Sequence, residues 1–365
     1  MTSLLIGIVG RAPASIVVAA RALRPDRTLL VHSDDTRTVA EVVQRQLADH
    51  GLPDPELVPA DPNSLNATAK AVTARLADVQ ETTQLAVDIT GGTKPMSLGL
   101  WEGTRALAAS LPPGLRSAVY LNAAGALLDA DTGEKVPEAE AVAIDPQEVI
   151  AWGRPEARVV AVWSGSPEEL DEGVCQRGLV WQQLAKAITK GTWRSNVSNP
   201  QRHFQPHRAP ATLSPGFAFT ADGSIEVPLK HLIHNGWLEE LALAEVAIAV
   251  KKLAGVRLAL SATVRGEASG NVELDLVATR GARTLVVEAK TVASGAGPQL
   301  SKKASHVAAL LGPNARLLAF VPSVFGGGHA AVQSRADMDA NLGRNGQICC
   351  SIDDLGHLAR IHLGG

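Results

Sequence analysis

The sequence predicts an α/β protein of two domains joined by a connector. Its 365 residues are enough to bury two separate hydrophobic cores. In the N-terminal part, short apolar runs alternate with stretches of helical periodicity. The C-terminal part follows a different order of helix, three strands, helix and strand. We therefore assign residues 1–148 to a first domain, 149–226 to the connector and 227–365 to a second domain.

The first domain is expected to have a Rossmann-like architecture, because parallel strands that feed helices through right-handed crossovers build such a layer. Its predicted strands are the apolar runs at residues 4–9, 28–32 and 85–89. Helical spacing predicts helices near 39–47, 66–79 and 96–109, and two further β-rich pieces span 118–122 and 125–129.

A glycine-containing loop, Thr90-Gly91-Gly92-Thr93-Lys94-Pro95, connects the third of these strands to its helix. Glycines let backbone N–H groups approach an anion, and the N-terminus of the following helix adds partial positive charge. Ligands of open α/β sheets bind beyond the carboxyl ends of strands. The loop matches neither a Walker A loop nor G-x-G-x-x-G, and an ordinary glycine turn with a helix cap is the alternative. Residues at other strand ends that can line the same crevice are Gly10, Arg11, Ala12, Ser33, Asp34, Asp35, Thr36, Asn122 and Ala123.

The second domain is predicted from a helix at 229–253, strands at 256–264, 271–278 and 284–290, a helix at 298–311 and a strand at 315–321. An Asp on one strand of a hairpin, followed by Glu-x-Lys on the next, is typical of the PD-(D/E)XK nuclease core. Asp275 and Glu288 can hold a divalent metal through oxygen. Lys290 lies on the same strand face as Glu288 and can stabilise charge on a phosphate. The alternative for the motif alone is a solvated hairpin rim, but the order of elements agrees with the nuclease core.

The connector carries less information. Residues 157–163 predict a strand, 174–188 a helix, and 192–223 a loop rich in Pro, Ser, Asn and Gln. Arg202 and His207 formally match the R-x4-H pattern of HEPN ribonucleases. We reject that match, since the pattern belongs on a helix.

Composition limits the remaining possibilities. The net charge of −3 and pI of about 6.4 do not indicate a nucleic-acid binder, so local basic groups must supply phosphate contacts. Three cysteines cannot form a disulfide framework. We find neither a membrane-spanning apolar run nor a signal peptide, and we expect a cytoplasmic protein. Basic residues that can surround the proposed cleft are Lys251, Lys252, Arg265, Arg280, Arg283, Lys302 and Lys303.

Two motifs together resemble a known family. The segment from Asp88 to Lys94 resembles the motif of the CARF domain, the CRISPR-associated Rossmann fold. Gly236-Trp237-Leu238-Glu239, with the Asp275, Glu288 and Lys290 set, resembles the nuclease half of CARF–PD-(D/E)XK effectors of type III CRISPR systems. Ala289 stands where family members often have Cys. The second domain would then be restriction-endonuclease-like.

This resemblance implies a homodimer whose paired CARF domains bind cyclic tetra-adenylate and activate a nuclease that uses Mn²⁺ or Mg²⁺ on DNA, RNA or both. It implies ligand contacts from Gly91, Gly92, Thr93 and Lys94. It also implies that Glu239, Asp275 and Glu288 bind the metal and that these three act in catalysis with Lys290. Glu240 is the alternative to Glu239 as the acid on the helix.

Two other functions remain open. One is a CARF regulator that binds nucleic acid without cleaving it, and the other is a constitutive restriction or repair nuclease. The sequence does not distinguish DNA from RNA, or one activator ring size from another.

Overall fold

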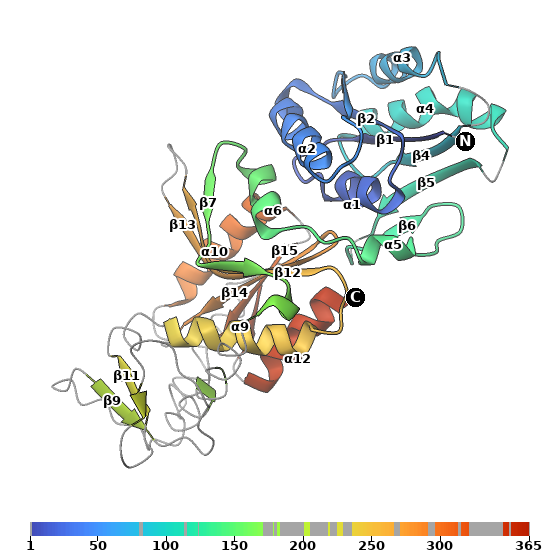
Figure 1. The fold of residues 1–365 in the computed structure, drawn as a ribbon. Helices are drawn as coiled ribbons and strands as arrows, with labels where there is room; N and C mark the ends of the chain where they lie inside the picture. Colours follow the sequence, from blue (N-terminus) through green and yellow to red (C-terminus); the bar gives the residue numbers. More distant parts are fainter. Residues whose placement is uncertain are drawn as a thin grey trace.

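A computed structural model shows two α/β domains side by side, with a helix of the connector between them (Figure 1). It describes residues 2–79, 83–112, 115–122, 124–170, 178, 181–182, 201–204, 218–219, 225–228, 236–265, 271–290, 296–312, 315–320, 346–349 and 352–364. Among these residues, no helix combines the length and the apolar character needed to cross a membrane.

The N-terminal domain contains a six-stranded sheet in the order β3-β2-β1-β4-β5-β6. Strands β1 to β5 are parallel and β6 is antiparallel to β5. The strand order reverses between β1 and β4, which is the topological switch point of a Rossmann-like sheet. The Rossmann-like architecture expected from the sequence is therefore present. The strands are β1 Ser3–Ile8, β2 Arg27–His32, β3 Glu56–Pro59, β4 Gln84–Asp88, β5 Arg116–Leu121 and β6 Leu127–Asp129.

Helices cover both faces of this sheet. Two buried clusters lie on opposite sides of it, because alternate residues of β1 belong to different clusters: Leu5 to one, Leu4 and Ile6 to the other. The N-terminal half of the first helix, from Ala14 to Ala20, is buried all round, so it lacks the amphipathic spacing that reveals a helix in sequence. The helices are α1 Ala14–Leu23, α2 Arg37–Asp49, α3 Leu65–Arg75, α4 Lys94–Ser110, α5 Pro137–Glu140 and α6 Pro146–Gly153, with a short 3-10 helix, η1, at Asp34–Thr36.

The C-terminal domain is built on a seven-stranded sheet in which β16-β15-β14-β13-β12-β7 follow one another and β8 also pairs with β12. The strands β12, β13 and β14 form an antiparallel meander, and β14, β15 and β16 are parallel. Two short strands of the predicted connector thus belong to this sheet. The strands are β7 Arg158–Val160, β8 Trp163–Gly165, β12 Val256–Arg265, β13 Val272–Arg280, β14 Arg283–Ala289, β15 Ala315–Phe320 and β16 Gly346–Cys349.

Among the described residues, four helices flank this sheet. Helices α9 (Gly236–Val250) and α12 (Ile352–Gly364) pack together over one face, where their side chains join one buried cluster with β13 and β14. On the other face lies α10 (Ala296–Leu311), against α6. A Cβ atom at Gly153 of α6 would lie 1.9 Å from the carbonyl oxygen of Leu310, so the two helices are in close contact. The predicted order of helix, three strands, helix and strand is present, with β16 and α12 added after it.

One prediction for the connector is wrong. Residues 192–223 were expected to form a loop, but β9 (Gln201–Phe204) and β10 (Ala218–Phe219) lie there and pair with β11 (Ile225–Pro228) in a small antiparallel sheet. These strands have two to four residues and mixed polarity, so they lack a period long enough to detect. Arg202 of the rejected R-x4-H pattern is on β9, and His207 is outside the described residues, as is most of the helix predicted at 174–188.

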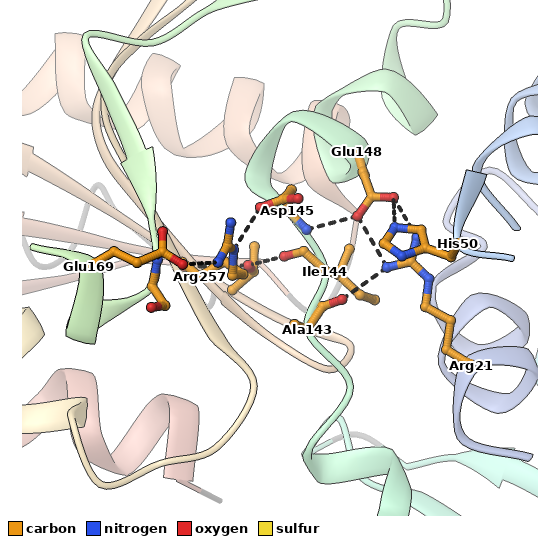
Figure 2. A network of polar contacts seen from close by, with 10 residues as sticks. Arg21, His50, Ala143, Ile144, Asp145, Glu148, Glu169 and Arg257 are labelled. Atoms are coloured by element: carbon orange, nitrogen blue, oxygen red, sulfur yellow. Dashed lines mark hydrogen bonds and ion pairs between the residues drawn. The ribbon is translucent and has the colours of Figure 1, made fainter.

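Polar contacts join the two domains through the start of α6 (Figure 2). The side chain of Glu148 contacts Arg21 on α1 and lies 3.1 Å from His50 Nε2 at the end of α2, and its Oε2 accepts a hydrogen bond from Asp145 N at 2.9 Å. On the other side, Arg257 Nε of β12 donates to Asp145 Oδ1 at 2.8 Å. The apolar core is also continuous here, since one buried cluster contains side chains of both domains and of α6.

Two arginines predicted near the cleft lie at this junction instead. Arg280 and Arg283 flank the β13–β14 turn, with exposed fractions of 7% and 3%. Arg283 Nε donates to the carbonyl of Ala124 in the N-terminal domain at 2.7 Å, and both guanidinium groups donate to the carbonyl of Leu363. Their charges therefore hold the domains and the last helix together, at the end of the strands away from the Asp-Glu-Lys motif.

Candidate functional site

The N-terminal domain has a pocket of about 480 Å³ at the carboxyl ends of β1, β2 and β4. It therefore lies at the switch point of the sheet, where a ligand is expected. Seven of the nine predicted ligand residues line it: Gly10, Arg11, Ser33, Thr36, Gly91, Gly92 and Thr93. Ala12 and Asp35, which belong to the strand ends named from the sequence, also line the pocket. Lining residues that the sequence analysis did not name as ligand contacts are Val9, Pro62, Thr90, Met96 and Leu121.

The glycines of the pocket are required by the close approach of two loops. A Cβ atom at Gly91 would lie 2.2 Å from the carbonyl oxygen of Ile8 at the end of β1. Gly92 has a φ of +77°, which other residues rarely adopt, and a Cβ atom there would meet the Ile8 side chain at 2.5 Å. Where Gly10, Gly91 and Gly92 line the pocket, its wall therefore consists of main-chain atoms.

Two predicted ligand residues are placed elsewhere. Asn122 Oδ1 accepts hydrogen bonds from Ala124 N at 2.9 Å and Ala126 N at 3.0 Å, so its side chain stabilises the β5–β6 turn. Lys94 is exposed at the first residue of α4 and is not among the residues lining the pocket. The hydroxyl of Thr93 caps α4 by accepting a hydrogen bond from Met96 N at 3.4 Å.

The predicted Asp-Glu-Lys set is assembled on β13 and β14 of the C-terminal domain. Asp275 and Glu288 are 6% and 2% exposed. Asp275 Oδ2 accepts a hydrogen bond from the main chain of Ala289 at 2.8 Å, which orients its carboxylate toward the next strand. Lys290 Nζ lies 2.7 Å from Glu288 Oε1, so the lysine and the glutamate share a strand face as expected.

A second lysine enters the same site from α10. Lys303 Nζ contacts Glu288 Oε2 and lies 3.8 Å from Asp275 Oδ1. In sequence it was only one of several basic residues near the proposed cleft. The structure distinguishes it, because it is the lysine that contacts both carboxylates.

The pKa values of the site are shifted because carboxylates of like charge are buried close together. Burial and then the charge of Glu288 raise the pKa of Asp275 to about 7. Burial also raises the pKa of Glu239. Burial acts to lower the pKa of Lys290, but the charge of Glu288 and its hydrogen bond outweigh that effect and raise it. The acids thus repel one another, and the lysines supply the positive charge that keeps them together.

The helix acids Glu239 and Glu240 have different neighbours. Glu239 Oε2 accepts a hydrogen bond from Ser261 Oγ at 2.7 Å, and its charge acts on Asp275. Glu240 instead accepts a hydrogen bond from Trp181 Nε1 at 2.9 Å. Of the two acids, Glu239 is therefore the one beside the carboxylate pair.

Ser261 has no recognisable motif in the sequence, but its geometry is unusual. It is a non-glycine residue with a φ of +48° in the middle of β12. The register pairs Leu260 with Leu276 and Ala262 with Leu274, so Ser261 lies opposite Asp275. A strained backbone position of this kind is common where a functional side chain must be oriented.

The carboxylates have the chemistry of a site for a hard divalent cation. Within the described part of the chain, no group of three acidic, His or Cys side chains is arranged to hold a metal. Magnesium, however, is commonly bound by one or two protein carboxylates, with water and substrate phosphate completing the shell. Asp275 and Glu288 fit that pattern, since their buried charges favour a cation. Glu239 as a third ligand remains a prediction.

The molecule thus consists of a Rossmann-like domain with a pocket at its switch point, joined to a domain with a buried carboxylate–lysine site. Residues 16–110 match the Card1 CARF domain family. A comparison with curated proteins gives no match. The whole chain is similar in structure to the protein VC1899 from Vibrio cholerae, with a TM-score of 0.69 and 16% identity over 100% of this chain and 99% of that one.

Two further solved structures are similar. Can2 from Sulfobacillus thermosulfidooxidans, in complex with cyclic tetra-adenylate, has a TM-score of 0.63 and 14% identity over 100% of both chains. A type III CRISPR defence DNA nuclease activated by cyclic oligoadenylate has a TM-score of 0.59 and 16% identity, over 88% of this chain and 45% of that chain. The family match shows that residues 16–110 are similar to a CARF domain, and the solved structures show that the chain shares their fold.

Proposed function

We propose that this protein is a metal-dependent nuclease of type III CRISPR defence, activated by cyclic tetra-adenylate and acting on DNA, RNA or both. The observation that carries the proposal is the presence in one chain of a pocket at the CARF switch point and a buried Asp275–Glu288 pair with two lysines. The catalytic domain is proposed to be of the PD-(D/E)XK, restriction-endonuclease-like type.

The pocket suits part of an anionic ring. Its lining includes the glycine loop, Met96 in the first turn of α4 and the basic residue Arg11, and all three favour a phosphate. We propose that two copies of the chain share one cyclic tetra-adenylate. Leu98 and Trp101 on α4 are 57% and 45% exposed, which offers an apolar face for the second copy.

In the proposed reaction, Asp275 and Glu288 would hold Mn²⁺ or Mg²⁺, with Glu239 beside them. The cation supplies charge that polarises the scissile phosphate and acidifies a water. The Ala289 N–H keeps the Asp275 carboxylate oriented through the hydrogen bond described above. The ammonium group of Lys290, on a side chain 34% exposed, can contact an incoming phosphate and stabilise its transition-state charge.

The contacts at the domain junction give a physical route for activation. Glu148 and Asp145 connect α1 of the CARF domain to β12 of the catalytic domain, and β12 carries Ser261, the partner of Glu239. A ligand shifts this equilibrium only by binding one arrangement of the domains more tightly than another. We propose that the ring binds the arrangement in which the catalytic clefts close on a strand.

The test is cleavage of single-stranded DNA, supercoiled plasmid and RNA in Mn²⁺, with and without cyclic tetra-adenylate. We expect cutting only with the activator and none in Asp275→Ala or Lys290→Ala, with activator affinity unchanged in both. Lys302→Ala is the matched control, because Lys302 is exposed on α10 and makes none of the contacts described for its neighbour.

The other outcomes separate the alternatives. Cutting without activator would support the proposed nuclease activity and contradict its proposed control by cyclic tetra-adenylate. Wild-type cutting by Asp275→Ala would exclude the proposed site. Tight activator binding without cutting would favour the non-catalytic regulator. The contact of Lys303 with both carboxylates is also compatible with that function.

A further inference from the structure

The carboxylate pair already has an internal cation. Lys303 extends from α10 to Glu288 and Asp275, while Lys290 contacts the other oxygen of Glu288. The positive charges of the two lysines equal in number the negative charges of the two carboxylates. The charge of Glu239 also acts on Asp275. Lys303 therefore contacts the same acidic side chains that would bind a divalent metal.

The position of Lys303 on its helix explains why it reaches the site. The buried residues Leu300, Ala304, Val307 and Leu311 form the face of α10 that packs on the sheet. Lys303 lies beside this face, with its side chain 19% exposed, whereas its neighbour Lys302 is exposed. The apolar stem can thus pack against the sheet while the ammonium group ends between the carboxylates.

We propose that Lys303 is an internal counter-ion that competes with the divalent cation for the oxygens of Asp275 and Glu288. A cation binds when the ammonium moves away, and a flexible four-carbon stem allows that movement. The displaced ammonium is then available to a nucleic-acid phosphate at the same cleft. Metal and nucleic acid would therefore bind with positive cooperativity through this one side chain. This inference rests on the proposed function for the identity of the metal site.

The test measures metal binding rather than cleavage. Mn²⁺ is titrated into the full chain by calorimetry, without nucleic acid, for wild type, Lys303→Met, Lys303→Arg and Lys302→Met. Met keeps most of the apolar stem and removes the charge. We expect Lys303→Met to bind Mn²⁺ roughly tenfold more tightly, since release from one competing charge contact is of this order. Lys302→Met should match wild type, and Lys303→Arg should not gain affinity.

A second measurement follows the same contact without metal. In chelator, Lys303→Met should lower the melting temperature, because Asp275 and Glu288 then repel each other with one fewer cation, and excess Mn²⁺ should restore it. Equal or weaker Mn²⁺ affinity in Lys303→Met would overturn the inference and leave the proposed nuclease intact. If no variant binds Mn²⁺ and the wild type does not either, the metal-dependent function fails as well.

Discussion

Replacing Asp275 by Asn should stabilise the protein above neutral pH while removing activity. The pKa of this carboxyl is raised from 3.8 to about 7, so the folded protein favours its neutral form and its ionisation is destabilising. The stability contributed by the neutral form is complete below pH 4 and is lost as the pH rises toward 7. One pKa unit corresponds to about 1.4 kcal/mol, so removing the ionisable group can raise the free energy of unfolding by at most roughly 4 kcal/mol. Asn retains an oxygen that can accept the hydrogen bond from Ala289.

The assay is thermal unfolding in chelator at pH 8 and at pH 5, with wild type, Asp275→Asn and Asp54→Asn. Asp54 is exposed in a loop and controls for the general effect of losing a carboxylate. We expect Asp275→Asn to raise the melting temperature at pH 8 by roughly 5 °C. The gain should be much smaller at pH 5. An equal loss of stability at both pH values would refute the reasoning, because it would mean that the ionised carboxylate is stabilising.

Three further predictions test other parts of the structure. Gly91→Ala places a Cβ atom 2.2 Å from the Ile8 carbonyl oxygen, so the glycine loop must shift. Calorimetry should then show that the variant loses most of its affinity for cyclic tetra-adenylate. If the variant binds as tightly as the wild type, the glycine loop is not part of the ligand site. Glu148→Gln weakens a nearly buried ion pair with Arg21 and should destabilise the protein by roughly 3 kcal/mol in urea unfolding at pH 7. Burial raises the pKa of Glu148, but the hydrogen bond and charge of Arg21 outweigh it and lower the pKa below its usual value of 4.5. The stability difference should therefore be complete above pH 4.5 and shrink as the pH falls through the lowered pKa, and a difference that does not shrink on acidification would contradict the assignment. Ser261→Gly and Ser261→Ala both remove the hydroxyl, but glycine adopts a φ of +48° without the strain that alanine has. The free energy of unfolding of the Gly variant should therefore be higher than that of the Ala variant by about 1 kcal/mol. Equal free energies of unfolding would argue against backbone strain at this position.

Much of the fold was predictable because its strands are short apolar runs followed by recognisable turns. The hairpin that carries Asp275 and Glu288 was found from the strands at 271–278 and 284–290, close to the observed bounds of β13 and β14. The glycine loop was also recognisable, since only glycine permits the approach of main chain that it makes. Helix α1 was missed because its first seven residues are buried on all sides, and β3, with one buried residue, shows no alternation.

Other features depended on contacts between distant segments. The short strands β9, β10 and β16 are defined by the partners that they pair with, and no local pattern records such pairing. Sequence spacing placed Asn122 near the ligand pocket, but its side chain forms hydrogen bonds within its own turn. Arg280 and Arg283 resembled phosphate-binding residues until the domain junction showed which carbonyls they contact.

The α/β class of both domains, the glycine loop and the Asp-Glu-Lys set could be predicted from the sequence, because each depends on residues within one or two adjacent elements. The sequence favoured Glu239 over Glu240, but the packed structure was needed to show which neighbours the two acids have, that Ser261 is the partner of Glu239, and that Lys303 joins the set from α10. Those choices depend on the rotation of a helix about its axis and on the packing of helices onto the sheet. Such packing brings together side chains far apart in the chain, and their spacing in sequence carries no record of it.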